Sequence, residues 1–129
     1  MITETIKTYS DACQVEGVDP VDSLPFPAET CAADEKAINA VAMLFRIARV
    51  LNEGWQPDWN NYNEYKYYPW FDMETYDKQV GSGVGFSCIV CDCVYTGTTV
   101  GSRLCFKTAD LAEYAGQQFE ALYNNYLSL

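Results

Sequence analysis

Apolar residues recur at helical spacing in several segments of the chain. In residues 2–13 they form a single stripe, which predicts a short N-terminal helix that ends near Gly17. Residues 32–52 are apolar on nearly every side and therefore predict a central helix that other elements cover. Either Thr30 or Asp34 is suited to cap the start of this helix, since both residue types can accept a hydrogen bond from a free backbone amide.

A last helix is predicted over residues 108–127. Thr108 is suited to cap it, and one face carries the apolar stripe Leu111, Ala115, Phe119, Leu122 and Tyr126. Between the two long helices, aromatic and β-branched residues predict three strands, over residues 65–68, 86–95 and 103–107. Alternation in the third strand directs Leu104 and Phe106 to the core, and Arg103, Cys105 and Lys107 to the other side.

The elements together predict an α+β fold in one domain over residues 1–129. A three-stranded antiparallel sheet is expected to pack on the central helix and the C-terminal helix, with the short N-terminal helix at one end. Residues 18–30 contain three prolines, which remove backbone donors and fix φ. We therefore expect this segment to be an extended connector inside the domain.

The balance of charges and the lengths of the apolar stretches exclude two classes of partner. Eighteen acidic residues stand against eight basic ones, for a net charge of -10, and this opposes generic binding to nucleic-acid backbones. The longest apolar stretch, residues 40–51, contains Arg46 and Arg49 and is far shorter than the ~20 residues of a membrane span. The chain begins without a signal-peptide pattern, so we expect a protein that stays inside the cell and does not bind membranes.

Histidine is absent, which excludes Ser-His and Cys-His nucleophile pairs and His-ligated metals. We expect no catalytic residues and no cofactor. The six cysteines are expected to be reduced thiols that pack as small apolar residues. The weaker alternative is a zinc-stabilised module that uses Cys88, Cys91, Cys93 and Cys105, although Cys88 and Cys91 point to opposite faces of a regular strand.

Residues 52–71 contain all three tryptophans and four tyrosines. This density of rings has two interpretations, a core with its lid or an exposed recognition surface, and a small core does not easily hide so many. The candidate ligand or partner surface comprises the aromatic residues Trp55, Trp59, Tyr62, Tyr65, Tyr67, Tyr68 and Trp70, with Lys66, Arg103 and Lys107 as polar contacts.

Three blocks of the chain carry a family resemblance. They are residues 6–13 together with 17–20, residues 52–72, and residues 100–108 together with 111–116. In this order they resemble a family of small proteins encoded by phages and mobile elements of gut Bacteroidales, over almost the whole chain. The resemblance carries over no activity or ligand, and the Cys88-x-x-Cys91-x-Cys93 cluster is not part of the family pattern. The resemblance implies an accessory protein in the cytoplasm of a bacterial host, or in the virion.

The function we expect is therefore non-enzymatic binding of a protein or a small ligand through the aromatic-rich surface. Exposed rings would also favour a homo-oligomer. The alternative is an anti-defence protein that inhibits a host nuclease or sequesters a nucleotide signal. A pocket lined by rings together with Arg or Lys would favour the nucleotide.

Overall fold

The computed structural model describes residues 1–73, 85–92 and 97–129. These ranges form an α+β fold of five helices and one two-stranded antiparallel sheet. In chain order the elements are α1 (Ile2–Thr5), α2 (Tyr9–Glu16), α3 (Ala33–Leu51), β1 (Lys66–Asp72), β2 (Gly85–Asp92), α4 (Ala109–Gln118) and α5 (Glu120–Leu127).

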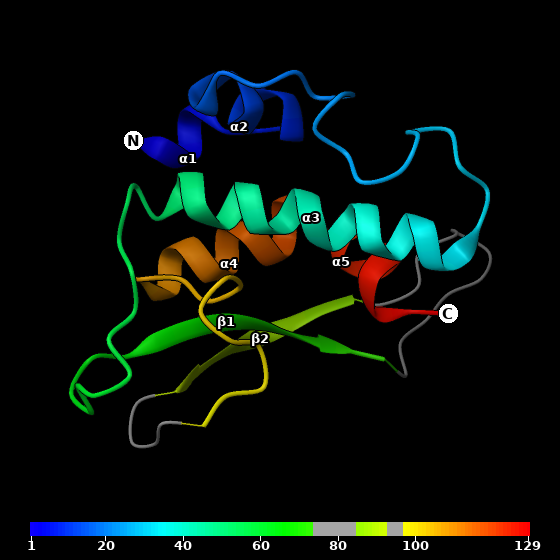
Figure 1. The fold of residues 1–129 in the computed structure, drawn as a ribbon. Helices are drawn as coiled ribbons and strands as arrows, with labels where there is room; N and C mark the ends of the chain where they lie inside the picture. The colour runs from blue at the N-terminus through cyan, green and yellow to red at the C-terminus, as the bar shows by residue number, and fades with distance from the viewer. Residues whose placement is uncertain (74–84, 93–96) are drawn as a thin grey trace.

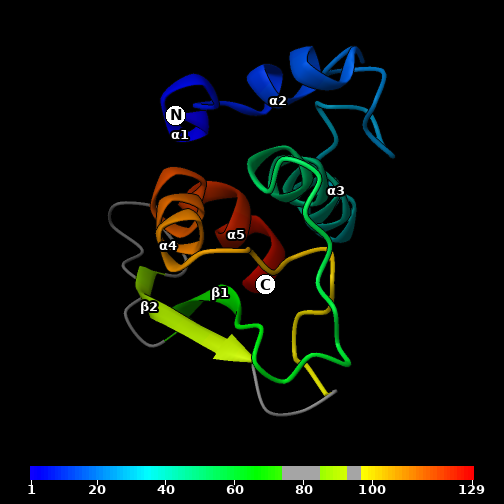
Figure 2. The ribbon, with the colours of Figure 1, turned by 90° about the vertical axis from the view of Figure 1, so that its left-hand side faces the viewer.

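The helices and the sheet are arranged in layers (Figure 1). Helices α1 and α2 lie on one side of α3, and α4 and α5 lie between α3 and the sheet, an order that the perpendicular view in Figure 2 also shows. The sheet packs mainly against α4, which agrees with the expected cover by the C-terminal helix. The central helix packs mainly against α2 and α5, so its expected position on the sheet is wrong.

The N-terminal segment forms two helices and not the single one predicted over residues 2–13. Ile6 adopts an extended conformation, with φ -102° and ψ 92°, and ends α1. Thr8 and Asp11 then form a capping box, in which the Thr8 amide donates to Asp11 Oδ2 at 2.9 Å and the Asp11 amide donates to Thr8 Oγ1 at 3.2 Å. A capping box favours a helix start at this point, so the chain begins a new helix here. Gly17, in the left-handed region at φ 70°, ends α2 as predicted.

The bounds predicted for the central helix are confirmed within a residue or two. Its N-cap is Ala32, which has no capping side chain, so the expectation that Thr30 or Asp34 caps it is wrong. Beyond its C-terminal end, Glu53 and Gly54 have positive φ angles of 50° and 87°, and the chain turns away toward the sheet. The Trp55 amide donates to the Asn52 carbonyl at 3.0 Å, which keeps this segment beside the last turn of α3.

The connector 18–30 contains neither helix nor strand, but it turns repeatedly and is not extended. The Ser23 amide donates to the Asp19 carbonyl at 3.1 Å and the Thr30 amide to the Pro27 carbonyl at 3.0 Å. Asn39 of α3 is buried and holds the middle of the connector, because it accepts from the Phe26 amide at 3.0 Å and donates to the Phe26 carbonyl at 3.3 Å.

The C-terminal segment also forms two helices. Thr108 caps α4 as predicted, accepting from the Leu111 amide at 3.1 Å. Phe119, at φ -111° and ψ 28°, separates α4 from α5. Tyr126, the last member of the predicted apolar stripe, is 40% exposed, whereas Tyr123, which the prediction did not include, is 5% exposed. The Tyr123 ring packs on Phe71 of β1 with ring centroids 4.7 Å apart, a contact between distant parts of the chain.

The sheet pairs β1 with β2 from Lys66 opposite Asp92 to Asp72 opposite Gly85, with a bulge after Trp70. The third predicted strand, 103–107, is reduced to one β-bridge between Tyr67 and Phe106, with N–H···O distances of 3.0 and 2.7 Å. The last residues predicted for the second strand, 93–95, lie outside the described residues.

Segment 103–107 does not alternate between two faces as a strand would. Leu104, Cys105 and Phe106 are consecutive and all buried, so the expectation that Cys105 faces away from the core is wrong. The main core lies between α3 and the C-terminal helices and extends to this segment. Its largest members are Ile6, Leu44, Ile47, Leu51, Leu104, Phe106, Leu111, Phe119 and Tyr123.

Candidate functional site

The aromatic residues of segment 55–71 are divided between the core and the surface. Tyr68 is buried, and its hydroxyl accepts a hydrogen bond from Thr99 at 3.3 Å. The half-exposed rings Tyr62, Tyr65 and Trp70 face solvent. The remaining candidate rings, Trp55, Trp59 and Tyr67, are partly buried. The segment is therefore neither a closed core nor one continuous recognition surface.

Lys66, predicted as a polar contact for a ligand, is instead enclosed by the chain around it. Its side chain is 2% exposed. The ammonium donates to the carbonyls of Asp58 and Asn61 at 2.6 and 3.0 Å, lies 3.4 Å from Glu64 Oε1, and sits 5.3 Å from the centre of the Trp59 ring. Its charge is already balanced and its donors are used, so Lys66 organises the loop 57–65 and is not available to a ligand.

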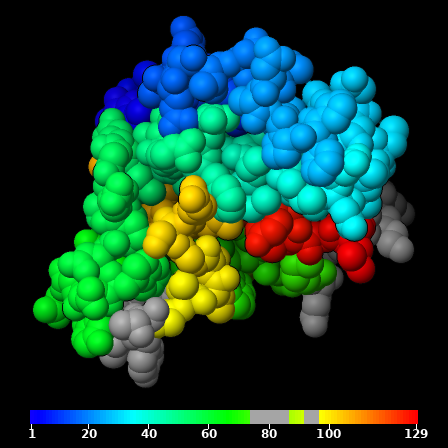
Figure 3. Space-filling model, viewed as in Figure 1, coloured from blue at the N-terminus to red at the C-terminus, as the bar shows by residue number. Residues whose placement is uncertain are grey.

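Trp59 connects this loop to the segment before α4. Its indole Nε1 donates to Ser102 Oγ at 2.7 Å. Together with the Tyr67–Phe106 bridge, this bond holds residues 55–67 beside residues 97–107. In Figure 3 the surface of residues 97–107, in yellow, projects below α3 between the green segment that follows α3 and the red α5.

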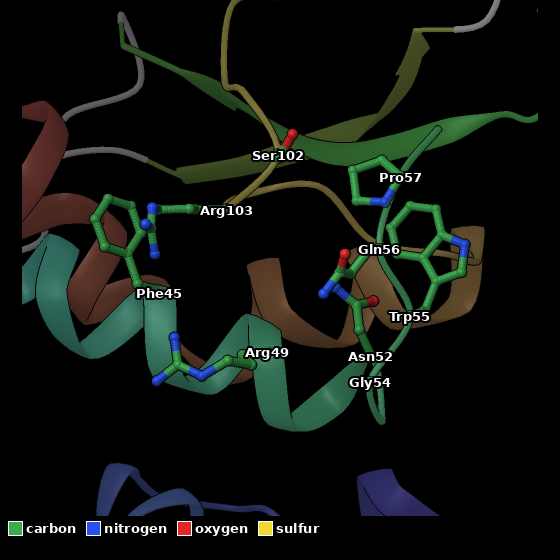
Figure 4. A pocket seen from close by; sticks show the side chains of 9 residues that line it. All are labelled: Phe45, Arg49, Asn52, Gly54, Trp55, Gln56, Pro57, Ser102 and Arg103. Atoms are coloured by element: carbon green, nitrogen blue, oxygen red, sulfur yellow. The ribbon is translucent and has the colours of Figure 1, made fainter. Parts of the chain in front are cut away.

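A pocket of about 370 Å³ lies where these two segments meet the C-terminal half of α3. It is lined by Phe45, Arg49, Asn52, Gly54, Trp55, Gln56, Pro57, Ser102 and Arg103. Figure 4 shows the guanidinium groups of Arg49 and Arg103 on one side of the pocket, and Trp55, Gln56 and Pro57 on the other. Its size is at the lower end of the ~300–1,000 Å³ that small-molecule sites occupy.

Arg103 provides a positive charge at the wall of the pocket. Its guanidinium lies over the Phe45 ring, with Cζ 5.5 Å from the ring centre. A cation above an aromatic face is attracted by the ring, and at an exposed site this contact contributes ~0.5–1 kcal/mol in favour of the observed direction of the side chain. In the described part of the chain Arg103 forms no ion pair, and its side chain remains exposed.

Arg49 is shared between the pocket and α2. Its Nε and Nη2 donate to the two carboxylate oxygens of Glu16 at 2.6 and 2.8 Å, and Arg46 Nε also donates to Glu16, at 2.6 Å. The hydrogen bond from Arg49, followed by that from Arg46, lowers the pKa of Glu16 from 4.5 to about 2, against the opposite effect of burial. The Nη1 group of Arg49 has no hydrogen-bond partner among the described residues and remains available at the pocket.

Asn52 shapes the floor of the pocket. Its amide nitrogen donates to the Cys105 carbonyl at 3.0 Å, and its oxygen accepts from the Lys107 amide at 3.1 Å. Because this buried side chain uses both ends to tie α3 to residues 105–107, it positions Arg103 relative to Arg49. Gln56, by contrast, is exposed and forms no side-chain hydrogen bond with the described residues.

The pocket contains only part of the predicted surface. Trp55 and Arg103 line it, whereas Lys107 lies within 3.7 Å of Glu53 in an ion pair outside the lining set. The other predicted rings are not among the lining residues. Sequence reasoning missed Phe45 and Arg49, because both lie on α3, a helix whose apolar character predicts only packing. The signal present in the sequence was the polar edge that Arg46 and Arg49 form on that helix.

The alternative zinc set is not assembled where the structure describes its members. Cys88 and Cys91 are exposed on β2, Cys105 is buried, and Cys93 lies outside the described residues. Over residues 1–73, 85–92 and 97–129, no group of three or more His, Cys, Asp or Glu side chains is placed to hold a metal ion.

Comparison of the chain with protein-family models, with curated proteins and with solved structures finds no match in any of the three. None of the helices in the described ranges has the length and apolar character needed to cross a membrane.

Proposed function

We propose that this protein is a non-enzymatic binding protein that takes a small anionic molecule into the pocket between α3, residues 54–57 and residues 102–103. The observation that carries the proposal is Arg103, an exposed guanidinium that lies against Phe45 at the pocket wall and has no carboxylate partner in the described ranges. In a chain with a net charge of -10, an unpaired arginine beside a hollow is a specific attraction for an anion.

A ligand in the pocket is affected more by the charged groups around the pocket than by the net charge of the chain. At physiological ionic strength the Debye length is ~8 Å, so carboxylates on the far surface are largely screened from a ligand in the pocket. Arg49 and Arg103 would touch the ligand directly, and no aspartate or glutamate is among the nine described residues that line the pocket. The nearby carboxylate of Glu16 binds both Arg46 and Arg49, so these three groups together with Arg103 still carry a net charge of +2. Binding of a compact anion is therefore favourable in spite of the acidic composition.

The lining residues favour binding over catalysis. Among the residues that the structure describes, the lining includes no carboxylate or thiol to act as a general base or nucleophile. The hydroxyl of Ser102, the one hydroxyl of the described lining residues, points away from the pocket in Figure 4 and accepts from Trp59. The family resemblance adds the biological context, an accessory protein of a phage or mobile element that acts in the host cytoplasm or is carried in the virion.

The test is native mass spectrometry of the protein after equilibration with a bacterial small-molecule extract, compared with its denatured mass. We expect a bound mass on the wild type and its loss in Gln56→Trp, which fills the pocket at an exposed residue. Gln117→Trp, the same substitution at an exposed site on α4, is the matched control and should retain the bound mass. Equal retention by Gln56→Trp and Gln117→Trp would show that the pocket is not the binding site.

A further inference from the structure

The two sides of the pocket differ in chemistry, and this difference defines a class of ligand. We infer, on the basis of the proposed function above, that the ligand is a nucleoside monophosphate, linear or cyclic. Its phosphate would lie between Arg49 and Arg103, and its base against Trp55.

The arginine side of the pocket suits a phosphate group. A guanidinium presents a planar fork of donors that matches two oxygens of one phosphate. Arg103 has all its nitrogen donors unused among the described residues, and Arg49 retains Nη1 after binding Glu16. Both guanidinium groups lie on the same side of the pocket (Figure 4), so the donors for a phosphate are gathered on that side.

The opposite side suits a flat ring with polar edges. Trp55 and Pro57 provide apolar walls, and a partly buried tryptophan is a stacking surface for any base. The Gln56 amide lies at the same wall (Figure 4) and offers both a donor and an acceptor to the edge of a base. A ligand with a phosphate at one end and a base at the other uses both sides at once.

The size of the pocket limits the ligand to one base. At about 370 Å³ the pocket is near the small end of the range for ligand sites. Lys66 is enclosed by the carbonyls of Asp58 and Asn61, and Lys107 is paired with Glu53. Neither of these described lysines is therefore available at the border of the pocket for a second phosphate. A dinucleotide or a nucleoside triphosphate would extend beyond the two arginines.

Isothermal titration calorimetry with a panel of defined compounds tests the inference. The panel is AMP, GMP, CMP, UMP and 3′,5′-cyclic AMP and GMP, with adenosine, guanosine, ribose 5-phosphate and inorganic phosphate as partial ligands. We expect at least one nucleotide to bind tenfold or more tightly than its nucleoside and than ribose 5-phosphate. Arg103→Gln should weaken that nucleotide tenfold or more and leave the nucleoside unchanged, because only the phosphate contact is removed.

Arg46→Gln is the matched control for charge and for the bonds to Glu16. Arg46 binds Glu16 and the Tyr9 hydroxyl but does not line the pocket, so its loss should change nucleotide affinity less than twofold. Arg103→Lys retains the charge without the planar fork and is expected to bind with intermediate affinity. The melting temperature of each variant, measured without ligand, separates a loss of binding from a loss of folding.

Each other outcome overturns the inference. A nucleoside that binds as tightly as its nucleotide, or Arg103→Gln that binds like the wild type, would refute the assignment of the phosphate to the arginines. If no nucleotide binds while the extract still gives a mass lost in Gln56→Trp, the ligand class is wrong and the proposed function stands. If the extract gives no such mass either, both are wrong.

Discussion

Glu16 connects α2 to two arginines of α3, and its removal has a calculable cost. The fold lowers the pKa of Glu16 from 4.5 to about 2, and each pKa unit corresponds to ~1.36 kcal/mol, so the arginines stabilise the folded state by at most ~3.4 kcal/mol. The Glu16 side chain is 23% exposed and that of Arg49 is 47% exposed, and water screens an interaction in this setting. We therefore expect Glu16→Gln to lower the free energy of unfolding by about 1.5–2 kcal/mol at pH 7.

The pH dependence identifies the origin of this loss. A carboxyl group whose pKa is lowered by folding contributes its full stability above its unfolded pKa and loses it as pH falls through the folded value. The difference between wild type and Glu16→Gln should therefore be complete above pH 5 and should shrink as pH falls from 4.5 toward 2.

Urea denaturation, followed by tryptophan emission at a series of pH values, measures both effects. With a slope of ~1–3 kcal/mol/M, the expected loss moves the midpoint by roughly 1 M at pH 7. Glu29→Gln removes the same charge at an exposed loop position and should shift the midpoint little. A Glu16→Gln midpoint equal to that of Glu29→Gln at pH 7, or a difference that persists undiminished near pH 2.5, would refute the reasoning.

Three further substitutions or reactions test other parts of the structure. Lys66→Met should cost roughly 2–3 kcal/mol of unfolding free energy by urea denaturation, because the carbonyls around the ammonium lose their donor; a cost below 0.5 kcal/mol would contradict the cage. Asn52→Ala should cost ~2 kcal/mol or more, and clearly more than Asn124→Ala, whose Oδ1 is buried without a hydrogen-bond partner among the described residues. Iodoacetamide labelling of the native protein, followed by peptide mass mapping, should modify exposed Cys31 and spare buried Cys13; equal modification of both would contradict the packing of α2.

Local sequence signals predicted the elements whose ends depend on nearby residues. Gly17 ends α2 and Thr108 begins α4, because a left-handed glycine and a capping hydroxyl act within a few residues of the backbone groups they satisfy. The bounds of α3 also follow from a local signal, which is a long run of apolar residues. Where a second local signal competes, the prediction was wrong, as at the Thr8–Asp11 capping box that divides the N-terminal helix.

The sheet was predicted less well because its third strand depends on a partner. Segment 103–107 has the composition of a strand, yet only Phe106 pairs, with Tyr67, and Asn52 takes the neighbouring backbone groups. The two hydrogen bonds of the Asn52 side chain, at the end of α3, thus take the place of the backbone hydrogen bonds that a third strand would form. No pattern within residues 103–107 indicates that competitor, which is about 50 residues earlier in the chain.

Patterns along the chain are sufficient to predict an α+β composition, the three helical regions, the first two strands, and a segment of aromatic residues with a few basic ones. Which of those residues act together follows only from the folded arrangement. It enclosed Lys66 within a loop, buried Cys105, and placed Arg49 of α3 and Arg103 at the same pocket as Trp55. Helix ends and turns depend on neighbouring residues, so a local pattern can predict them. The charge state, exposure and partners of a side chain depend on segments that the fold brings together from distant positions.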